Sequence, residues 1–306
     1  MSRIEQALEK AAHTRGTHKD GMNPLPEPVP HGHGDHEATV QIAPPPPMEF
    51  GGDVTTDNPL LATLFDPHSP VSEEFRKLKS AIVAGAGAGG FNNTIMVASA
   101  LEGEGKSMAS LNLAITLSQE YDHTVLLIDA DLRKPSLSAY LGIRPEKGLS
   151  DFLRRRRELP EILYKTGIGR LTLLPAGEPV RNPVELLSSQ RMKDLMGEIK
   201  SRYPDRFVIV DTPPVLPFAE TRALSAMVDG IVLVVKEGKS SPKMINEMLE
   251  TITRKKVMGV VYNEATIGNL TGRYDYYRQY RYGYDTPPSE RKGGGLLDRL
   301  SIRNRN

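Results

Sequence analysis

The chain has 306 residues, of which 39% are hydrophobic and 25% charged, as expected of a globular protein with one large α/β domain and additional segments. Its formal net charge of +1 provides no field that favours nucleic acid, so no nucleic-acid partner is expected, and the absence of cysteine excludes disulfides and thiolate metal sites. No apolar run approaches the roughly 18 residues that span a bilayer. We therefore expect a cytoplasmic protein that a partner recruits to the inner face of the cell membrane.

The N-terminal fifth of the chain, residues 1–58, is predicted to contain no globular domain. Residues 1–12 are predicted to form a short amphipathic helix, because Ile4, Leu8 and Ala11 fall on one helical face. This is either a frayed terminal helix or a docking helix for a partner. Residues 13–58 are rich in proline, glycine and histidine, and such a composition predicts a disordered linker.

Residues 59–265 alternate between apolar strands and helices. The predicted strands are residues 94–100, 124–129, 171–174, 207–211, 230–235 and 257–262, and the main predicted helices are residues 106–119 and 183–200. Continuous apolar strands that alternate with helices indicate a doubly wound α/β fold with a mostly parallel sheet. Ligands of such folds bind beyond the carboxyl ends of the strands.

A glycine-rich loop joins the first predicted strand to the first long helix. Its sequence, ALEGEGKS at residues 100–107, has Walker A spacing with alanine in place of the first glycine. Glycines allow backbone N–H groups to surround phosphate, the lysine would bridge the β- and γ-phosphates, and the serine would bind Mg²⁺. The strand–loop–helix context favours this interpretation over a glycine-rich turn with an incidental lysine. The predicted cofactors are ATP and Mg²⁺, held by Gly103, Glu104, Gly105, Lys106, Ser107, Met108 and Asn263.

Carboxylates follow two of the other predicted strands. Asp129 and Asp131 come after VLLI, and Asp211 comes after FVIV. An aspartate at a strand end can cap the next helix, but buried carboxylates are costly unless a cation or hydrogen-bond donors accompany them. Together with the phosphate loop, they favour Mg²⁺ ligation and activation of a nucleophile. The predicted metal ligands are Ser107, Asp131 and Asp211.

The two motifs that contain these aspartates resemble those of a known protein family. VLLIDADLRKP at residues 125–135 and FVIVDTPP at residues 207–214 resemble the Walker A′ and Walker B motifs of the bacterial tyrosine kinases of polysaccharide export, the BY-kinases. Further similar segments lie at residues 69–79, 148–153 and 174–188. The resemblance implies a P-loop NTPase with deviant Walker motifs, similar in architecture to the partitioning ATPases. The opening helix and long linker resemble the subgroup associated with exosortase systems.

The resemblance implies a catalytic role for particular residues. The implied catalytic residues are Lys106, Asp129, Asp131, Asp211 and Arg133. Asp129 would accept the proton of the tyrosine hydroxyl, and Arg133 would steady the γ-phosphate or the loop. The partitioning ATPases carry a lysine where this chain has Leu101. This difference favours a kinase, and an ATP-driven assembly switch without kinase activity is the alternative.

The resemblance also implies partners. BY-kinases form rings through an ExxRxxR motif, which here reads Glu73, Arg76 and Lys79, and lysine lacks the planar fork of arginine. The implied assembly is a homo-oligomeric ring. A separate transmembrane protein that sets polysaccharide chain length would activate the kinase, and a protein tyrosine phosphatase would reverse its action.

Residues 266–306 contain six of the 11 tyrosines, which are Tyr274, Tyr276, Tyr277, Tyr280, Tyr282 and Tyr284. This cluster is a phosphoacceptor segment, an Arg/Tyr surface that stacks on RNA or single-stranded DNA, or a plain exposed tail. The resemblance favours the first, with autophosphorylation in trans that regulates exopolysaccharide synthesis and export. Residues 273–284 carry three arginines and one aspartate, so two phosphates of about −1.5 to −2 each would reverse the segment's charge.

Overall fold

The computed structural model describes residue 54 and residues 56–86, 92–202 and 205–266. These ranges contain nearly all of the predicted domain of residues 59–265. The predicted helix of residues 1–12, nearly all of the linker and the tyrosine cluster lie outside the described residues, so those expectations stay predictions.

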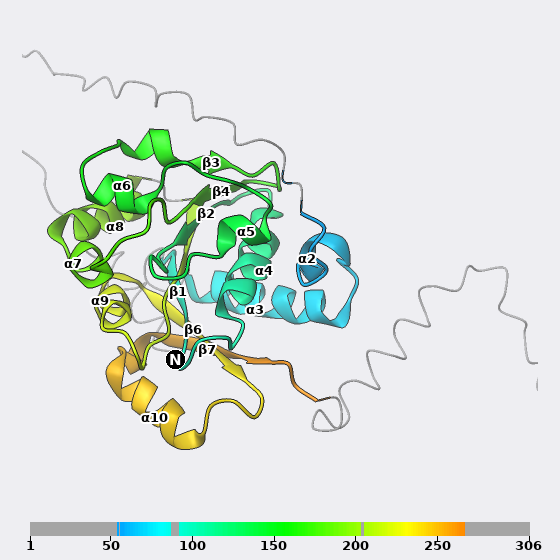
Figure 1. Cartoon of the computed structure of the whole chain (residues 1–306). Helices are drawn as coiled ribbons and strands as arrows, with labels where there is room; N and C mark the ends of the chain where they lie inside the picture. Colours follow the sequence, from blue (N-terminus) through cyan, green and yellow to red (C-terminus); the bar gives the residue numbers. More distant parts are fainter. Residues whose placement is uncertain (1–53, 55, 87–91, 203–204, 267–306) are drawn as a thin grey trace, which may run out of the picture. The chain divides into compact units, whose positions relative to one another are not determined.

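The described part is built on a seven-stranded sheet with the order β3-β4-β2-β5-β1-β6-β7 (Figure 1). Its strands are β1 (Thr94–Ser99), β2 (Thr124–Asp129), β3 (Tyr164–Lys165), β4 (Leu171–Leu174), β5 (Arg206–Asp211), β6 (Gly230–Lys236) and β7 (Val257–Asn263). All neighbouring strands pair in parallel except β3, which pairs antiparallel with β4. The predicted mostly parallel sheet is therefore confirmed.

Helices cover both faces of the sheet: nearly every residue of the central strands β1 and β5 is buried, although successive side chains point to opposite faces. Ile95 and Val97 of β1 pack toward α2, α3, α4 and α5, whereas Met96 and Ala98 pack toward α6, α7, α8, α9 and α10. These helices are α2 (Ala62–Phe65), α3 (Pro70–Ala86), α4 (Lys106–Ser118), α5 (Leu137–Tyr140), α6 (Leu149–Leu153), α7 (Pro183–Leu187), α8 (Gln190–Arg202), α9 (Glu220–Met227) and α10 (Pro242–Thr251), with 3₁₀ turns η1 (Leu159–Ile162) and η2 (Arg254–Lys256).

The predicted single helix over residues 183–200 is wrong, because the chain forms the two helices α7 and α8 instead. Two serines separate them. The Ser188 hydroxyl donates to the Val184 carbonyl at 2.6 Å, and the Ser189 hydroxyl oxygen accepts the Met192 N–H at 3.2 Å. Serine side chains that bond to nearby backbone groups compete with the helical ladder, which explains the break.

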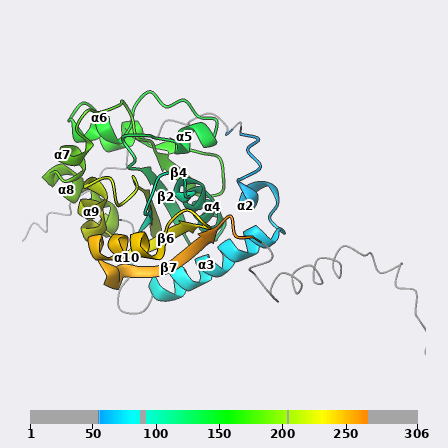
Figure 2. The same ribbon diagram turned by 60° about the horizontal axis from the view of Figure 1, so that its bottom comes forward.

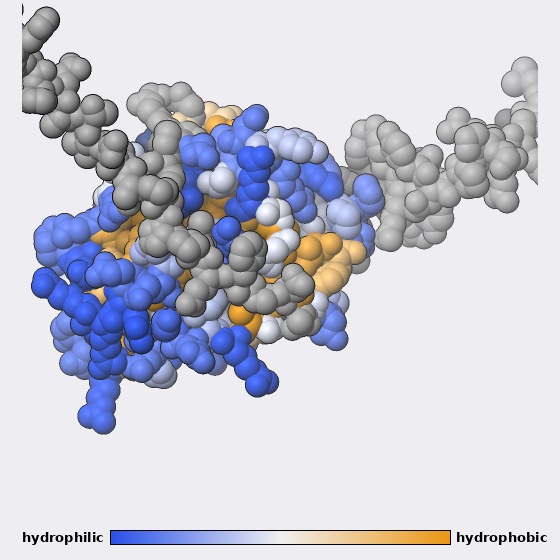
Figure 3. Space-filling model, turned by 90° about the horizontal axis from the view of Figure 1, so that it is seen from above, coloured by the Kyte–Doolittle hydropathy of each residue, from blue (hydrophilic) through white to orange (hydrophobic). Residues whose placement is uncertain are grey.

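Strand β7 forms one edge of the sheet and lies between α3 and α10 (Figure 2). Its side chains alternate between half-buried and exposed, and the exposed ones are Met258, Val260 and Tyr262. The face shown in Figure 3 is mostly hydrophilic, with apolar surface between the charged residues. Among the described residues, no helix is long and apolar enough to cross a membrane.

The loop after β4 packs directly on the start of α6. A Cβ atom at Gly148 would lie 2.3 Å from both the Pro175 carbonyl oxygen and the Gly177 backbone nitrogen. We expect Gly148→Ala to lower the free energy of unfolding by about 3 kcal/mol, because backbone on both sides has to shift. Urea unfolding measures this loss. The control is Gly197→Ala in α8, where nothing lies within 4 Å of the new methyl group and a gain of about 0.5–1 kcal/mol is expected. Equal stability of the two variants would contradict the prediction.

Candidate nucleotide-binding and catalytic site

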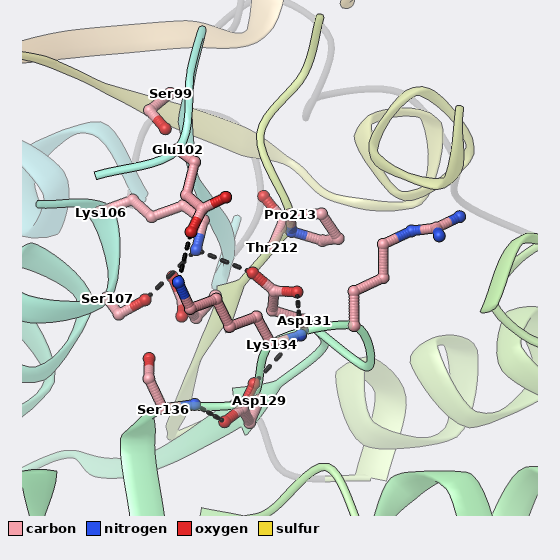
Figure 4. Close-up of polar contacts among 12 residues, drawn as sticks. Ser99, Glu102, Lys106, Ser107, Asp129, Asp131, Lys134, Ser136, Thr212 and Pro213 are labelled. Carbon is pink, nitrogen blue, oxygen red and sulfur yellow. Dashed lines mark hydrogen bonds and ion pairs between the residues drawn. The ribbon is translucent and has the colours of Figure 1, made fainter. Parts of the chain in front are cut away.

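Strands β1, β2 and β5 bring the candidate residues to one end of the sheet (Figure 4). β1 ends at Ser99 and leads through the phosphate loop into α4, which begins at Lys106. Asp129 and Asp211 are the last residues of β2 and β5, and they lie side by side in the parallel register. The predicted convergence at the carboxyl ends of the strands is therefore present.

The phosphate loop has a backbone that requires glycine. Gly103 and Gly105 have φ angles of 72° and 92°, in the left-handed region that other residues rarely adopt. A Cβ atom at Gly105 would also lie 2.1 Å from the Asn263 side-chain nitrogen. The loop thus curls in front of the N-terminus of α4, where backbone N–H groups and the helix dipole favour phosphate.

Glu104 connects the phosphate loop to the segment after β6 and to the end of β7. Its side chain is fully buried, and its two oxygens accept the Leu101 N–H at 2.7 Å and the Ser240 hydroxyl at 2.8 Å. Asn263 at the end of β7 donates its side-chain amide to the Glu104 carbonyl at 2.9 Å. The predicted contact of Asn263 with adenine stays a prediction, because the structure shows this side chain against the loop itself.

Lys106 lies among the three acidic residues. Its Nζ is 3.0 Å from an Asp131 carboxylate oxygen and 3.3 Å from the Ser107 hydroxyl oxygen (Figure 4). Burial alone would lower the pKa of Lys106, but the negative charges of Asp211 and Asp131 outweigh burial and raise it. The lysine therefore stays protonated and supplies a fixed positive charge at the N-terminus of α4.

Asp129 is fully buried and holds the turn that follows β2. One oxygen accepts the Asp131 N–H at 3.2 Å, and the other accepts the N–H groups of Ser136 and Leu137, each at 3.2 Å. Burial, followed by the negative charge of Asp211, raises the pKa of Asp129 to about 8. This carboxyl group therefore exchanges a proton near neutral pH.

Asp211 offers a carboxylate oxygen that could bind a hard cation. One of its oxygens accepts the Ser110 hydroxyl at 3.1 Å, and the other is buried without a hydrogen-bond partner among the described residues. Burial raises the pKa of Asp211, while Lys106 and the Ser107 hydroxyl oppose that rise. An unpartnered carboxylate oxygen close to the Ser107 hydroxyl fits Mg²⁺, which is commonly held by one or two carboxylates together with phosphate and water. The described residues contain no group of three or more His, Cys, Asp or Glu that could hold a metal ion.

Arg133 points toward α9 and is held there. Its Nε donates to the buried Glu220 carboxylate at 2.5 Å, and its guanidinium lies 4.4 Å from the centre of the Phe218 ring. These contacts hold the Arg133 side chain against Glu220 and Phe218, and its expected role in steadying the loop stays a prediction. A contact with the γ-phosphate stays a prediction.

Two cations at the loop were missed by sequence reasoning. Lys134 forms an ion pair with Glu102 that joins the loop after β2 to the phosphate loop, and the Lys134 hydrogen bond lowers the pKa of Glu102 (Figure 4). Lys239, in the segment after β6, is the second cation. Its Nζ lies close to Gly103, because a Cβ atom added at this glycine would be only 2.8 Å from it. Both lysines are exposed and add positive charge where phosphate is expected.

The other predicted residues lie elsewhere. Met108 is half-buried and packs on the apolar core beneath α4. Glu73, Arg76 and Lys79 lie on α3, where Arg76 pairs with Glu73 at 2.6 Å and Lys79 pairs with Glu120. The Glu73–Arg76 pair is partly exposed, and such ion pairs contribute little to stability, so either residue can form a different ion pair at low cost.

Comparisons with known proteins identify the family of the chain. The family described as an AAA domain matches residues 92–261. The chain is 33% identical over 214 residues to the tyrosine-protein kinase YwqD of Bacillus subtilis, which covers 69% of this chain and 88% of the relative. The chain belongs to the bacterial tyrosine kinase family. The tyrosine-protein kinase CpsD of Streptococcus agalactiae is 30% identical over 62% of this kinase and 82% of its own length.

Solved structures show the same fold. The kinase domain of the Escherichia coli tyrosine kinase ETK superposes with a TM-score of 0.61 and 28% identity, covering 67% of this kinase and 82% of that chain. The chimerical protein CapA2B2 gives a TM-score of 0.63 and 29% identity over 71% and 95%. Against a longer relative, the putative tyrosine-protein kinase EpsB of Ralstonia nicotianae, this kinase spans 30% of the length at 32% identity. The P-loop fold implies that it binds a nucleotide.

Proposed function

We propose that this kinase uses ATP and Mg²⁺ to phosphorylate the tyrosine cluster at its own C-terminus, with one copy acting on another. The observation that carries the proposal is a cluster at the phosphate loop, made of the half-buried Lys106 and three buried carboxylates. Phosphoryl transfer needs such a cluster for positioning and charge neutralisation. The family membership supports protein tyrosine as the acceptor. The tyrosine-rich segment follows β7, whose last residue contacts the phosphate loop.

Each residue of the site has a proposed role. The backbone of the phosphate loop and Lys106 bind the phosphates of ATP. Ser107, Asp131 and Asp211 would hold Mg²⁺, which would offset the negative charge of the phosphates when bound. Asp129 accepts the proton of the tyrosine hydroxyl as the phenol oxygen bonds to the γ-phosphorus and ADP leaves. Its pKa of about 8 supports this role, because a general base works best when its pKa is near the working pH.

We further propose that copies assemble into a ring through α3 and that the kinase serves exopolysaccharide synthesis and export. Glu73 and Arg76 are partly exposed on α3, and the large apolar residues Leu60, Phe65 and Val71 are exposed close by along the chain. A relative that is 32% identical is named as the succinoglycan biosynthesis transport protein ExoP of Rhizobium meliloti. A membrane protein as activator, recruitment to the inner membrane face and a phosphatase as antagonist belong to the same proposal.

The test is phosphosite mapping by mass spectrometry after incubation with ATP and Mg²⁺. We expect phosphate on several of the six clustered tyrosines, and none in a variant with all six replaced by phenylalanine. Size-exclusion chromatography of the same samples should show that ATP dissociates the wild-type oligomer only. Nucleotide hydrolysis without any phosphotyrosine would contradict the kinase proposal and favour an assembly ATPase. Dissociation of the phenylalanine variant by ATP would contradict the role of tyrosine phosphate in ring release.

A further inference from the structure

A cavity of about 630 Å³ lies between the α5 region and the loop after β4. It is lined in part by Pro135, Ser138, Ile143, Arg144, Pro145 and Pro175. Pro135 and Ser138 flank Ser136 and Leu137, whose backbone N–H groups hold Asp129. The cavity and the candidate catalytic base are therefore formed by the same turn of chain, although none of the assigned site residues lines the cavity.

The lining combines apolar surface with one charge. Three prolines, an isoleucine and two alanines form walls suited to a flat hydrophobic group such as an aromatic ring. Arg144 is the one charged residue of the lining, is exposed, and makes no ion pair with any described residue. Arg156, by contrast, is paired at 2.7 Å with Glu178, which directly follows the cavity residue Gly177.

An arginine that forms no ion pair with a described residue and lines a cavity of mixed polarity has a characteristic ligand. The guanidinium fork binds phosphate oxygens in a bidentate manner, and the apolar walls can take the ring that carries the phosphate. Unphosphorylated residues 273–284 carry a net charge of +2, which disfavours their approach to an arginine, whereas a tyrosine phosphate adds about −1.5 to −2. The chemistry therefore distinguishes phosphotyrosine from tyrosine.

We propose that this cavity binds a phosphotyrosine side chain from the tyrosine-rich segment of a second copy of the chain. The inference rests on the proposed function, because that function supplies the phosphotyrosine. The ring lies between the prolines and the phosphate binds Arg144. A bound phosphotyrosine then holds its segment at the enzyme while another tyrosine of the same segment approaches Asp129.

The spacing of the tyrosines suits this arrangement. Tyr274 and Tyr276, and likewise Tyr280 and Tyr282, are separated by one residue, so that in an extended segment they are about 7 Å apart and on the same side. One of a pair can occupy the cavity while the other is near the turn that holds Asp129. The expected consequence is that the first phosphorylation of a segment speeds the next.

A binding experiment tests the cavity without any catalytic step. A fluorescent peptide of residues 273–284 with one phosphotyrosine at position 276 is titrated with the full-length protein, and anisotropy gives the Kd. Saturating ADP and Mg²⁺ are included so that the phosphate loop is filled. Arg144→Ala removes the charge, and Ala139→Phe fills the cavity from the exposed side of α5. Arg254→Ala is the matched control, an exposed arginine before β7 at the opposite end of the sheet.

We expect Arg144→Ala and Ala139→Phe each to weaken binding of the phosphopeptide at least tenfold, with no change for Arg254→Ala. The unphosphorylated peptide and inorganic phosphate should each bind at least tenfold more weakly than the phosphopeptide. Unchanged affinity of both cavity variants, or equal binding of the two peptides, would overturn the inference. Inorganic phosphate that binds as tightly as the phosphopeptide would also overturn it, because the cavity would then be a plain anion site. Because the peptide is phosphorylated chemically, failure of the kinase proposal would leave this result unaffected.

Discussion

Lys106→Met is expected to reduce autophosphorylation by at least about 10³-fold, the scale of losing a preorganised charge in an active site. Lys106 is a half-buried cation among three carboxylates, and its Nζ is 3.0 Å from an Asp131 carboxylate oxygen. Methionine has a similar length but leaves the phosphates of ATP without this charge. Phosphotyrosine is measured by mass spectrometry on protein made in a host that lacks such kinases. Lys193→Met, an exposed position on α8, serves as the control and should retain full activity.

The same substitution should alter the dependence of stability on pH without preventing folding. Lys106 lowers the pKa of Asp129 and Asp211, so its removal raises both further above their unfolded values. A native state with raised carboxyl pKa values binds more protons than the unfolded state, and its stability falls as pH rises from about 4 through those values. The Tm deficit of Lys106→Met should therefore be larger at pH 8 than at pH 5. Persistent phosphotyrosine, or a deficit that shrinks with rising pH, would contradict this account.

The phosphate loop and the acidic strand ends were predictable because each is encoded by neighbouring residues. An apolar run of about four residues bounded by polar ones specifies a buried parallel strand, and the residue after the run must then lie at the end of that strand. Asp129 and Asp211 were placed in this way and lie side by side in the structure. Gly103 and Gly105 were likewise identified by their spacing from Lys106, and both have positive φ angles.

The remaining parts of the site depend on contacts between distant segments. Ser240 binds the Glu104 carboxylate across 136 positions of sequence, and Arg133 binds Glu220 across 87. No local pattern encodes such pairs. Ser110 was also missed, although a helical period of 3.6 residues places it on the same face of α4 as Lys106, where it bonds Asp211. The two-residue strand β3 is too short to leave an alternating pattern in the sequence.

Asp211→Asn is expected to abolish kinase activity, by about 10³-fold or more, and at the same time to stabilise the protein in the absence of metal and nucleotide. The carboxylate is fully buried, and one of its oxygens has no partner among the described residues. Asparagine removes the buried charge and its repulsion from Asp131. Its side-chain oxygen can still accept the hydrogen bond that the Ser110 hydroxyl now donates to an Asp211 oxygen at 3.1 Å. A gain of roughly 0.5–2 kcal/mol is typical of single stabilising substitutions.

The sign of the pH effect makes this prediction specific. Burial raises the pKa of Asp211 above its usual value of 3.8, so its contribution to native stability is greatest below pH 3.8 and decreases as pH rises toward the folded pKa. Asparagine does not titrate, and its advantage over the wild type in EDTA should therefore be larger at pH 7.5 than at pH 4. Excess Mg²⁺ and ADP should stabilise the wild type more than the variant, because the variant lacks the anionic ligand. Asp205→Asn, exposed at the opposite end of β5, should show neither effect. A variant that is less stable than the wild type in EDTA at pH 7.5 would show that the Asp211 charge is already compensated without a cation.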